Sequence, residues 1–166
     1  MIGDWSIRPE RPGDEAAISQ VIGEAFAGAD HSDGTEARIV EQLRAGGSLA
    51  LSLVAEGNGV LGHVAFSPVD ISDGSVRWFG LGPVAVAPYR QGVGIGAALI
   101  EQGLDLLRQM DAAGCVVLGE PAYYGRFGFR HDPALVYPGP PPEYFQRLVL
   151  NGGPARGTVR YAPAFG

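Results

Sequence analysis

The feature that most constrains this chain is a glycine-rich loop between an apolar run and a helical pattern near its middle. Trp78–Val86 is predicted to be a strand, Pro88 follows it, and a helix is predicted from about Gly94 to Met110. A short buried strand is expected next, at Val116–Gly119. This strand-loop-helix-strand unit has the length of a crossover that joins parallel neighbours in a sheet. The predicted fold class is therefore α/β.

The patterns before and after this unit add further elements. The predicted elements are an extended segment from Ser6 to Arg8, a helix at Glu15–Phe26, a second helix with the apolar stripe Ile39, Val40 and Leu43, strands at Leu49–Ala55 and Val60–Val69, a short helix at Tyr123–Phe127 and a late strand at Gly157–Tyr161. Gly57-Asn58-Gly59 is a hairpin signal, because such turns require positive φ, so the two strands around it should pair antiparallel.

Composition limits the class of protein. With 166 residues, 46% of them hydrophobic, the chain is predicted to form a single domain over 1–166. No apolar run approaches the roughly 18 residues that cross a bilayer, and the start is mixed and polar, so a cytoplasmic protein without a membrane partner is expected. The single cysteine, Cys115, cannot form an internal disulfide and is predicted to be a small buried thiol. A net charge of −6 without a basic cluster argues against a nucleic-acid partner and weakly favours a cationic one. A homodimer is left open.

The loop from Pro88 to Gly96 is suited to binding a pyrophosphate. Several backbone N–H groups must converge on such a ligand, and Gly92, Gly94 and Gly96 allow the chain to approach it closely. The start of the following helix adds about half a positive charge, and Arg90 can add a charge-assisted contact. The alternative is a tight strand-to-helix connection with no ligand.

A dinucleotide fingerprint is a second alternative. Gly92–Ala97 matches G-x-G-x-x-A, and Glu120 follows the last glycine by about 24 residues, near the distance expected for a ribose-binding acid. However, Pro88 to Gln91 intervene between the strand and the first glycine. Only about 46 residues follow Glu120, too few for the second half of a doubly wound sheet. The spacing therefore argues against a nicotinamide dinucleotide.

Two motifs give the chain a resemblance to a known family. Val84-Ala85-Val86-Ala87-Pro88 followed by Gln91-x-x-Gly94-x-Gly96 resembles the acetyl-CoA motif (Q/R)-x-x-G-x-(G/A) of the GNAT N-acetyltransferases, together with its preceding strand. The later stretch Gly119–Phe129 resembles the Y-x-x-x-G-F segment of that family. Most of the chain is similar to the predicted-acetyltransferase branch often called YhbS-like.

The resemblance implies a central mixed sheet opened like a V and flanked by helices, with the pantetheine arm of CoA in the split. It implies that Val84, Ala85 and Val86 meet the pantetheine, and that Gln91, Gly92, Val93, Gly94, Ile95 and Gly96 meet the phosphates. The implied activity is direct acetyl transfer from acetyl-CoA, without a metal, to a primary amine of an unidentified acceptor, which is a small molecule or a peptide. A GNAT-shaped domain that binds CoA as a sensor, without catalysis, is the alternative.

The resemblance also implies a catalytic acid, whereas the base stays open. Tyr124 matches the tyrosine of Y-x-x-x-G-F, and a phenol is protonated at neutral pH and can donate to the CoA sulfur. The alternative is a core aromatic with a satisfied hydroxyl. The candidates for the general base, named only by residue type, are Glu120, Glu24, Asp70, His63 and an ordered water. On the acceptor side, His31–Glu36 is the most suggestive stretch, and helix capping by Asp33 or Thr35 is the preferred interpretation of it.

Overall fold

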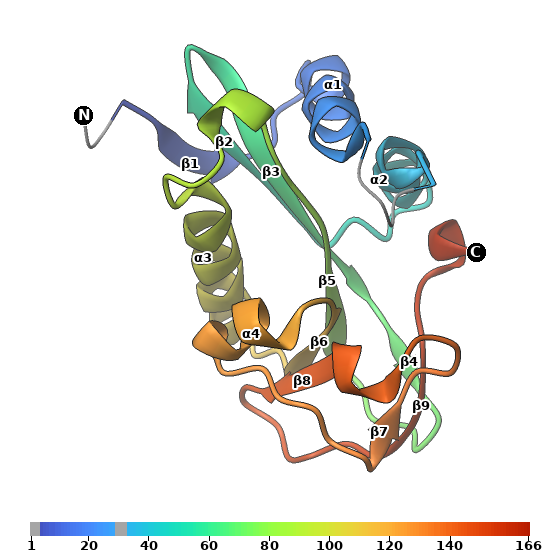
Figure 1. The fold of residues 1–166 in the computed structure, drawn as a ribbon. Helices are drawn as coiled ribbons and strands as arrows, with labels where there is room; N and C mark the ends of the chain where they lie inside the picture. The colour runs from blue at the N-terminus through green and yellow to red at the C-terminus, as the bar shows by residue number, and fades with distance from the viewer. Residues whose placement is uncertain (1–3, 29–32) are drawn as a thin grey trace. The chain divides into compact units, whose positions relative to one another are not determined.

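The computed structural model describes residues 4–28 and 33–166 of the chain (Figure 1). The helices are α1 (Glu15–Phe26), α2 (Glu36–Ala45), α3 (Ile95–Gln109) and α4 (Pro121–Tyr124). The strands are β1 (Ser6–Pro9), β2 (Leu51–Gly57), β3 (Gly59–Pro68), β4 (Asp70–Ile71), β5 (Trp78–Val86), β6 (Gly114–Leu118), β7 (Leu135–Val136), β8 (Phe145–Val149) and β9 (Gly157–Arg160).

Among the described residues, the strands form a six-stranded sheet of order β1-β2-β3-β5-β6-β8 and a three-stranded sheet of order β4-β9-β7. In the larger sheet β1, β2 and β3 pair antiparallel, β5 pairs parallel with β6, and β6 pairs antiparallel with β8. The predicted mixed sheet flanked by helices is thus confirmed. The chain divides into two compact units, the first made of Met1–Phe66 and Gly82–Gly103 and the second of Ser67–Leu81 and Leu104–Gly166. That residues 1–166 act as one domain stays a prediction.

The first unit packs helices on both faces of the β2–β3 hairpin (Figure 1). On one face, α1 buries Ile18, Val21 and Ile22, whose i, i+3, i+4 spacing forms a single apolar stripe. On the other face, a Cβ built on Gly62 of β3 would lie 3.2 Å from side-chain atoms of Ile95 and Leu99 of α3. A larger residue than glycine there would therefore push α3 away from the sheet.

The hairpin turn corrects one sequence argument. The strands pair antiparallel as predicted, through a bulge between Ala55 and Glu56. Of the turn residues only Gly59 has a positive φ, of +94°. Gly57 is needed for a different reason, because a Cβ there would lie 2.8 Å from the backbone oxygen of Asp4. Close packing, and not backbone conformation, therefore favours the first glycine.

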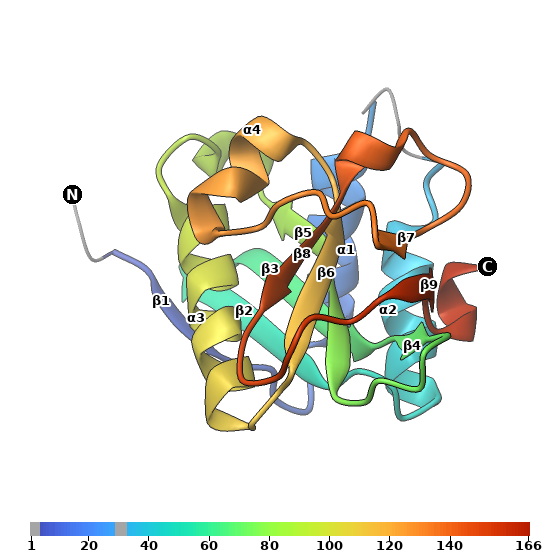
Figure 2. The same cartoon turned by 90° about the horizontal axis from the view of Figure 1, so that it is seen from below.

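The second unit, whose elements β6, β8 and α4 are labelled in Figure 2, differs most from the sequence predictions. The strand predicted at Val116–Gly119 begins two residues earlier, at Gly114, where the ring of Trp78 lies against the glycine. Strand β8 was not predicted, although it pairs with β6 along its whole length. The helix predicted at Tyr123–Phe127 is wrong in its bounds: α4 ends at Tyr124 and a 3-10 turn, Gly125–Phe127, follows.

Two simpler predictions can be compared with the structure directly. Cys115 is fully buried in β6, as expected, and burial raises the pKa of its thiol far above the ordinary value. In the part of the chain that the structure describes, no helix has the length and apolar character that a membrane span requires.

Candidate functional site

The glycine-rich loop joins β5 to α3 through a 3-10 turn at Pro88–Arg90. Gly92 and Gly94 have φ of +81° and +92°, a backbone region that L side chains rarely adopt. A Cβ at either position would meet no atom within 4 Å. Close packing is therefore not the reason for glycine at these positions. The positive φ is the reason, and the space beside the two residues is open to a ligand.

The first turn of α3 supplies donors at the end of this loop. The Ala98 N–H donates to the Gly94 carbonyl at 3.0 Å, so the N–H groups of Ile95 and Gly96 precede the helical ladder and have no helical acceptor. The Ile95 side chain is buried in the core, which leaves only its backbone for a ligand. A helix of 15 residues places a partial positive charge at this end. The arrangement suits an anion.

The side chains of Arg90 and Gln91 are already engaged with the protein. The Gln91 amide Nε2 donates to the Val86 carbonyl at 3.1 Å and so fixes the loop to the end of β5. Arg90 Nη2 donates to Asp4 Oδ1 at 2.8 Å, and this pair is partly exposed. Because exposed ion pairs contribute only about 0–1 kcal/mol, a phosphate can compete with Asp4 for the arginine. Sequence reasoning did not foresee the Gln91 contact.

The last residues of β5 can contact a ligand through their backbone groups more than through their side chains. Ala85 is buried against α1 in the first unit, whereas Val84 and Val86 are half-buried. In the parallel pairing of β5 with β6, the β5 residues that have partners are Trp78, Phe79 and Gly80. Among the described residues, none of β5 after Gly80 pairs with β6. The later part of β5 is thus outside the β5–β6 ladder.

Tyr124 lies at the end of α4, within the second unit. A Cβ built on Gly119 would lie 2.9 Å from Cδ2 of Tyr124, so the glycine makes room for the ring. The ring of Phe129 packs edge-on against the Tyr124 ring, with 6.1 Å between the ring centroids. Burial raises the pKa of Tyr124 to about 12, with a smaller contribution from Tyr123. Its hydroxyl has no hydrogen-bond partner among the described residues and stays protonated at neutral pH, so it is free to donate.

The carboxylates named as base candidates lie in exposed positions. Glu24 is exposed on α1 and accepts a hydrogen bond from Gln20. Asp70 on β4 is 82% exposed and faces Arg160 at 3.7 Å. Glu120 is exposed at the N-cap of α4 and makes no side-chain capping bond. None of the three has the buried, hydrogen-bonded surroundings typical of a tuned base.

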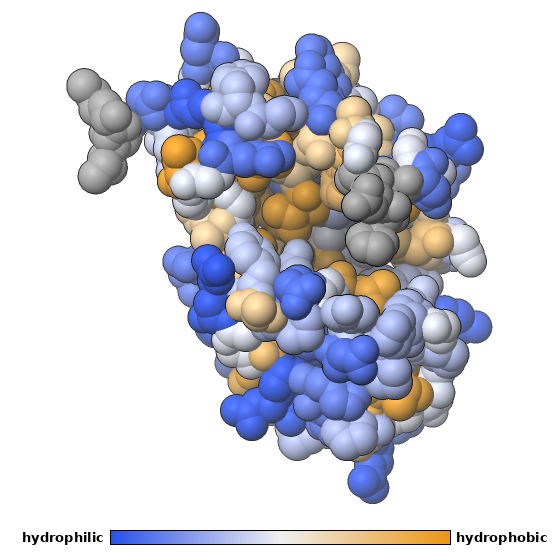
Figure 3. Space-filling model, viewed as in Figure 1, coloured by the Kyte–Doolittle hydropathy of each residue, from blue (hydrophilic) through white to orange (hydrophobic). Residues whose placement is uncertain are grey.

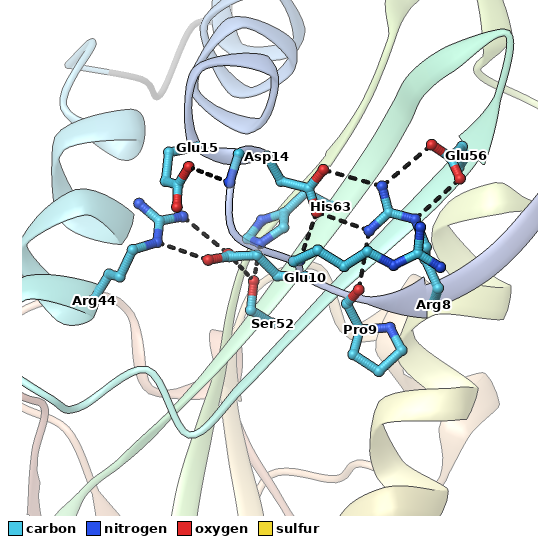
Figure 4. Close-up of polar contacts among 11 residues, drawn as sticks. Arg8, Pro9, Glu10, Asp14, Glu15, Arg44, Ser52, Glu56 and His63 are labelled. Atoms are coloured by element: carbon cyan, nitrogen blue, oxygen red, sulfur yellow. Dashed lines mark hydrogen bonds and ion pairs between the residues drawn. The ribbon is translucent and has the colours of Figure 1, made fainter.

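His63 has such surroundings (Figure 4). It is fully buried in β3, and its Nε2 lies 2.8 Å from Ser52 Oγ. Ser52 donates in turn to Glu10 Oε1 at 2.5 Å, and Arg44 of α2 holds the same carboxylate with two hydrogen bonds. Burial of Glu10 alone would raise its pKa, but the hydrogen bonds from Arg44 and Ser52 lower it overall. Glu10 is thus an ionised acceptor.

This chain of bonds fixes the His63 tautomer. The Ser52 hydroxyl has one proton, which goes to Glu10, so its oxygen must accept from Nε2–H of His63. Burial lowers the pKa of His63 to about 4, so the ring is neutral and Nδ1 carries a lone pair. Nδ1 is buried and has no hydrogen-bond partner in the part of the chain that the structure describes. A nitrogen with so low a pKa is a hydrogen-bond acceptor, not an effective base at neutral pH.

The structure describes part of the predicted acceptor-side stretch His31–Glu36, from Asp33 onward. His31 and Ser32 lie outside the described residues. Asp33 Oδ1 accepts from the backbone N–H and the hydroxyl of Thr35. Thr35 is the N-cap of α2 but makes no side-chain capping bond. The capping preferred for this stretch is therefore replaced by a local turn. Elsewhere, no cluster of three or more His, Cys, Asp or Glu side chains suited to a metal ion occurs within residues 4–28 and 33–166.

Comparison with known proteins decides the family. The model of the acetyltransferase (GNAT) family matches residues 16–129, more than half of the chain. This chain belongs to the GNAT acetyltransferase family. The N-acetyltransferase YhbS of Escherichia coli K12 is 41% identical over 96% of this chain and 97% of its own length. As in that family, the larger sheet is mixed, and the strands of the described residues do not form the doubly wound parallel sheet of the dinucleotide alternative.

Solved structures agree with this membership. A GNAT acetyltransferase from Brucella melitensis, crystallised with acetyl-CoA, superposes with a TM-score of 0.86 and 48% identity, covering 98% of each chain. E. coli YhbS, crystallised with CoA, superposes with a TM-score of 0.87 and 36% identity over 97% of this GNAT chain and 91% of its own. The branch suggested by the sequence motifs is thereby confirmed.

Proposed function

We propose that this GNAT protein transfers the acetyl group of acetyl-CoA directly to a primary amine, with the CoA pyrophosphate held by the backbone N–H groups of Gln91–Gly96. The observation that carries the proposal is the open space beside Gly92 and Gly94, at left-handed φ, directly before the N-terminus of α3. The complexes of the two solved relatives with acetyl-CoA and CoA support the same donor.

The backbone of Val84–Val86 is proposed to bind the pantetheine arm. This part of β5 lies outside the β5–β6 ladder, and an arm with two amide groups can pair with strand backbone as an added strand does. The same edge can supply an N–H to the thioester oxygen, where negative charge develops in the transition state. Side-chain identity matters little for such contacts, whereas strand conformation matters greatly.

Tyr124 is proposed as the general acid. The ammonium group of the acceptor first loses a proton to solvent, and the neutral amine attacks the thioester carbon. The carbon–sulfur bond breaks, and the Tyr124 hydroxyl protonates the departing thiolate. The nitrogen, which became positively charged on attack, releases a proton to solvent to give the amide, and the Tyr124 phenolate regains a proton from solvent. The free, protonated hydroxyl supports this role, as does the match of Tyr124 to the family motif. Exposed Glu24, Asp70 and Glu120 and neutral His63 give no support to a dedicated base.

Two measurements test the proposal. Acetyl-CoA at 100 times its dissociation constant should stabilise the fold by about 2.7 kcal/mol, and a matched titration with NADH should produce no shift. Release of free thiol in the presence of a panel of primary amines should exceed the release without amine. Binding without amine-dependent thiol release would favour the non-catalytic CoA sensor, and the absence of any binding would refute both.

A further inference from the structure

The second unit contains a pocket of about 310 Å³ that the proposed CoA contacts do not use. It is lined by Leu135 and Val136 of β7, Phe145 of β8, the ring of Tyr137 and prolines of the segment 138–142, with His131 also in its wall. The volume is at the lower end of the range for small-molecule sites. Around β7 and β9 the space-filling view shows hydrophobic colour within a mainly hydrophilic surface (Figure 3).

Prolines restrict the backbone of the pocket wall. Each proline in the segment 138–142 fixes its own φ near −65°, and Gly139 is the one residue of the segment without this restriction. The Tyr137 ring packs on Phe145 at 5.6 Å between centroids, and Phe145 and Leu135 are themselves buried. A preformed apolar wall lowers the entropic cost of binding.

The Tyr137 ring in the pocket wall contacts a second tyrosine. The ring of Tyr137 packs edge-on against the Tyr161 ring, with 5.1 Å between the ring centroids. The pKa of Tyr161 is raised mainly by burial, and further by the neighbouring Cys115 thiol and the Tyr137 and Tyr124 hydroxyls. Tyr161 packs against the hydrophobic core and does not line the pocket.

The free hydroxyl in the pocket wall suits an amine. The hydroxyl of Tyr137 has no hydrogen-bond partner among the described residues, and its oxygen can accept from an N–H group. Tyrosine ring faces also attract ammonium groups. A fatty acyl chain of the donor has no N–H group for this oxygen. The ligand that matches both features is an amine with an apolar substituent.

We propose that the pocket binds the apolar group of the acceptor, so that the preferred substrates are primary amines carrying an aromatic or branched aliphatic group, with the amine directed toward the Tyr137 hydroxyl. The inference rests on the proposed function, since it takes the acceptor to be an amine. A net charge of −6 favours such a cationic ligand over an anionic one.

The test measures amine binding without acetyl-CoA, so that it does not depend on turnover. The probes are 2-phenylethylamine and, as the polar comparison, ethanolamine. Val136 is 41% exposed, so Val136→Arg and Val136→Trp should charge or fill the pocket without disturbing the core. Val76 is 64% exposed and does not line the pocket, so Val76→Arg is the matched control. Tyr137→Phe removes only the phenol oxygen.

Calorimetry should show 2-phenylethylamine binding at least 10-fold more tightly than ethanolamine. Both Val136 variants should weaken 2-phenylethylamine binding at least 10-fold, Tyr137→Phe should weaken it about 3- to 10-fold, and Val76→Arg should leave it unchanged. Equal binding of the two amines, or equal effects of Val136→Arg and Val76→Arg, would overturn the inference.

A pocket for the acyl chain would be revealed by a Val136→Trp loss of octanoyl-CoA affinity with amine binding intact, which also overturns the inference. Failure of the proposed function is a separate observation: the wild type would then bind no acetyl-CoA, whatever it does with the amine.

Discussion

Replacing Gly94 by alanine separates the cost of the loop conformation from the contribution of the loop to ligand binding. An alanine at φ +92° costs about 1–2 kcal/mol, because its Cβ crowds the adjacent carbonyl. No atom within 4 Å meets the added methyl group, so no steric cost is expected in the free protein. A bound pyrophosphate would meet it. Losing one charge-assisted N–H contact costs about 1.5–3 kcal/mol, which is a loss of roughly 10- to 100-fold in CoA affinity.

Gly13 provides the matched control in the same unit. Its φ is +102°, and a Cβ there also meets no atom within 4 Å. Urea unfolding should show similar destabilisation for Gly94→Ala and Gly13→Ala, whereas calorimetry with CoA should show a lower affinity only for Gly94→Ala. Equal CoA affinities for the two folded variants would refute the reasoning, because the phosphates would then lie elsewhere.

Three further predictions concern Tyr124, Gly119 and His63. Tyr124→Phe should retain acetyl-CoA binding and lower the single-turnover rate about 10²- to 10⁴-fold; an unchanged rate from pH 6 to 9 would return Tyr124 to a packing role. Gly119→Ala should displace the Tyr124 ring, cost about 1–3 kcal/mol and lower turnover, whereas Gly125→Ala, where a Cβ meets nothing within 4 Å, should not. The folded pKa of His63, about 4, lies below the ordinary 6.5. The lowered pKa means that neutral His63 contributes up to about 3 kcal/mol to the free energy of unfolding. This contribution is fully present above pH 6.5 and is lost as the pH falls toward 4. His63→Gln should abolish this slope in urea titrations and His131→Gln, on an exposed histidine, should not; a slope that survives His63→Gln contradicts the assignment.

Local patterns predicted the elements around the loop well. The strand Trp78–Val86 has the predicted bounds, and α1 has them too, because each signal lies in consecutive residues. Gly94 also has the positive φ that a loop glycine suggests. Periodicity and turn chemistry act over a few residues, so a single sequence is enough to show them.

Contacts that depend on register were beyond the sequence. Glu10, Ser52 and His63 are separated by 42 and 11 residues. They meet only because β1 pairs with β2 and β2 pairs with β3, each in one register. Strand β8 follows a proline-rich segment and contains Gln146 and Arg147, so its pattern is weak; its strand conformation depends on pairing with β6. The pairing of Arg90 with Asp4, 86 residues away, is a further example.

A crystal structure of the protein with bound acetyl-CoA would test the central claim most directly. The account predicts pyrophosphate oxygens within hydrogen-bonding distance of backbone N–H groups between Gln91 and Gly96, at the start of α3. It also predicts pantetheine amides paired with Val84–Val86. Pyrophosphate bound away from this loop, with Gly92 and Gly94 facing solvent in the complex, would contradict it.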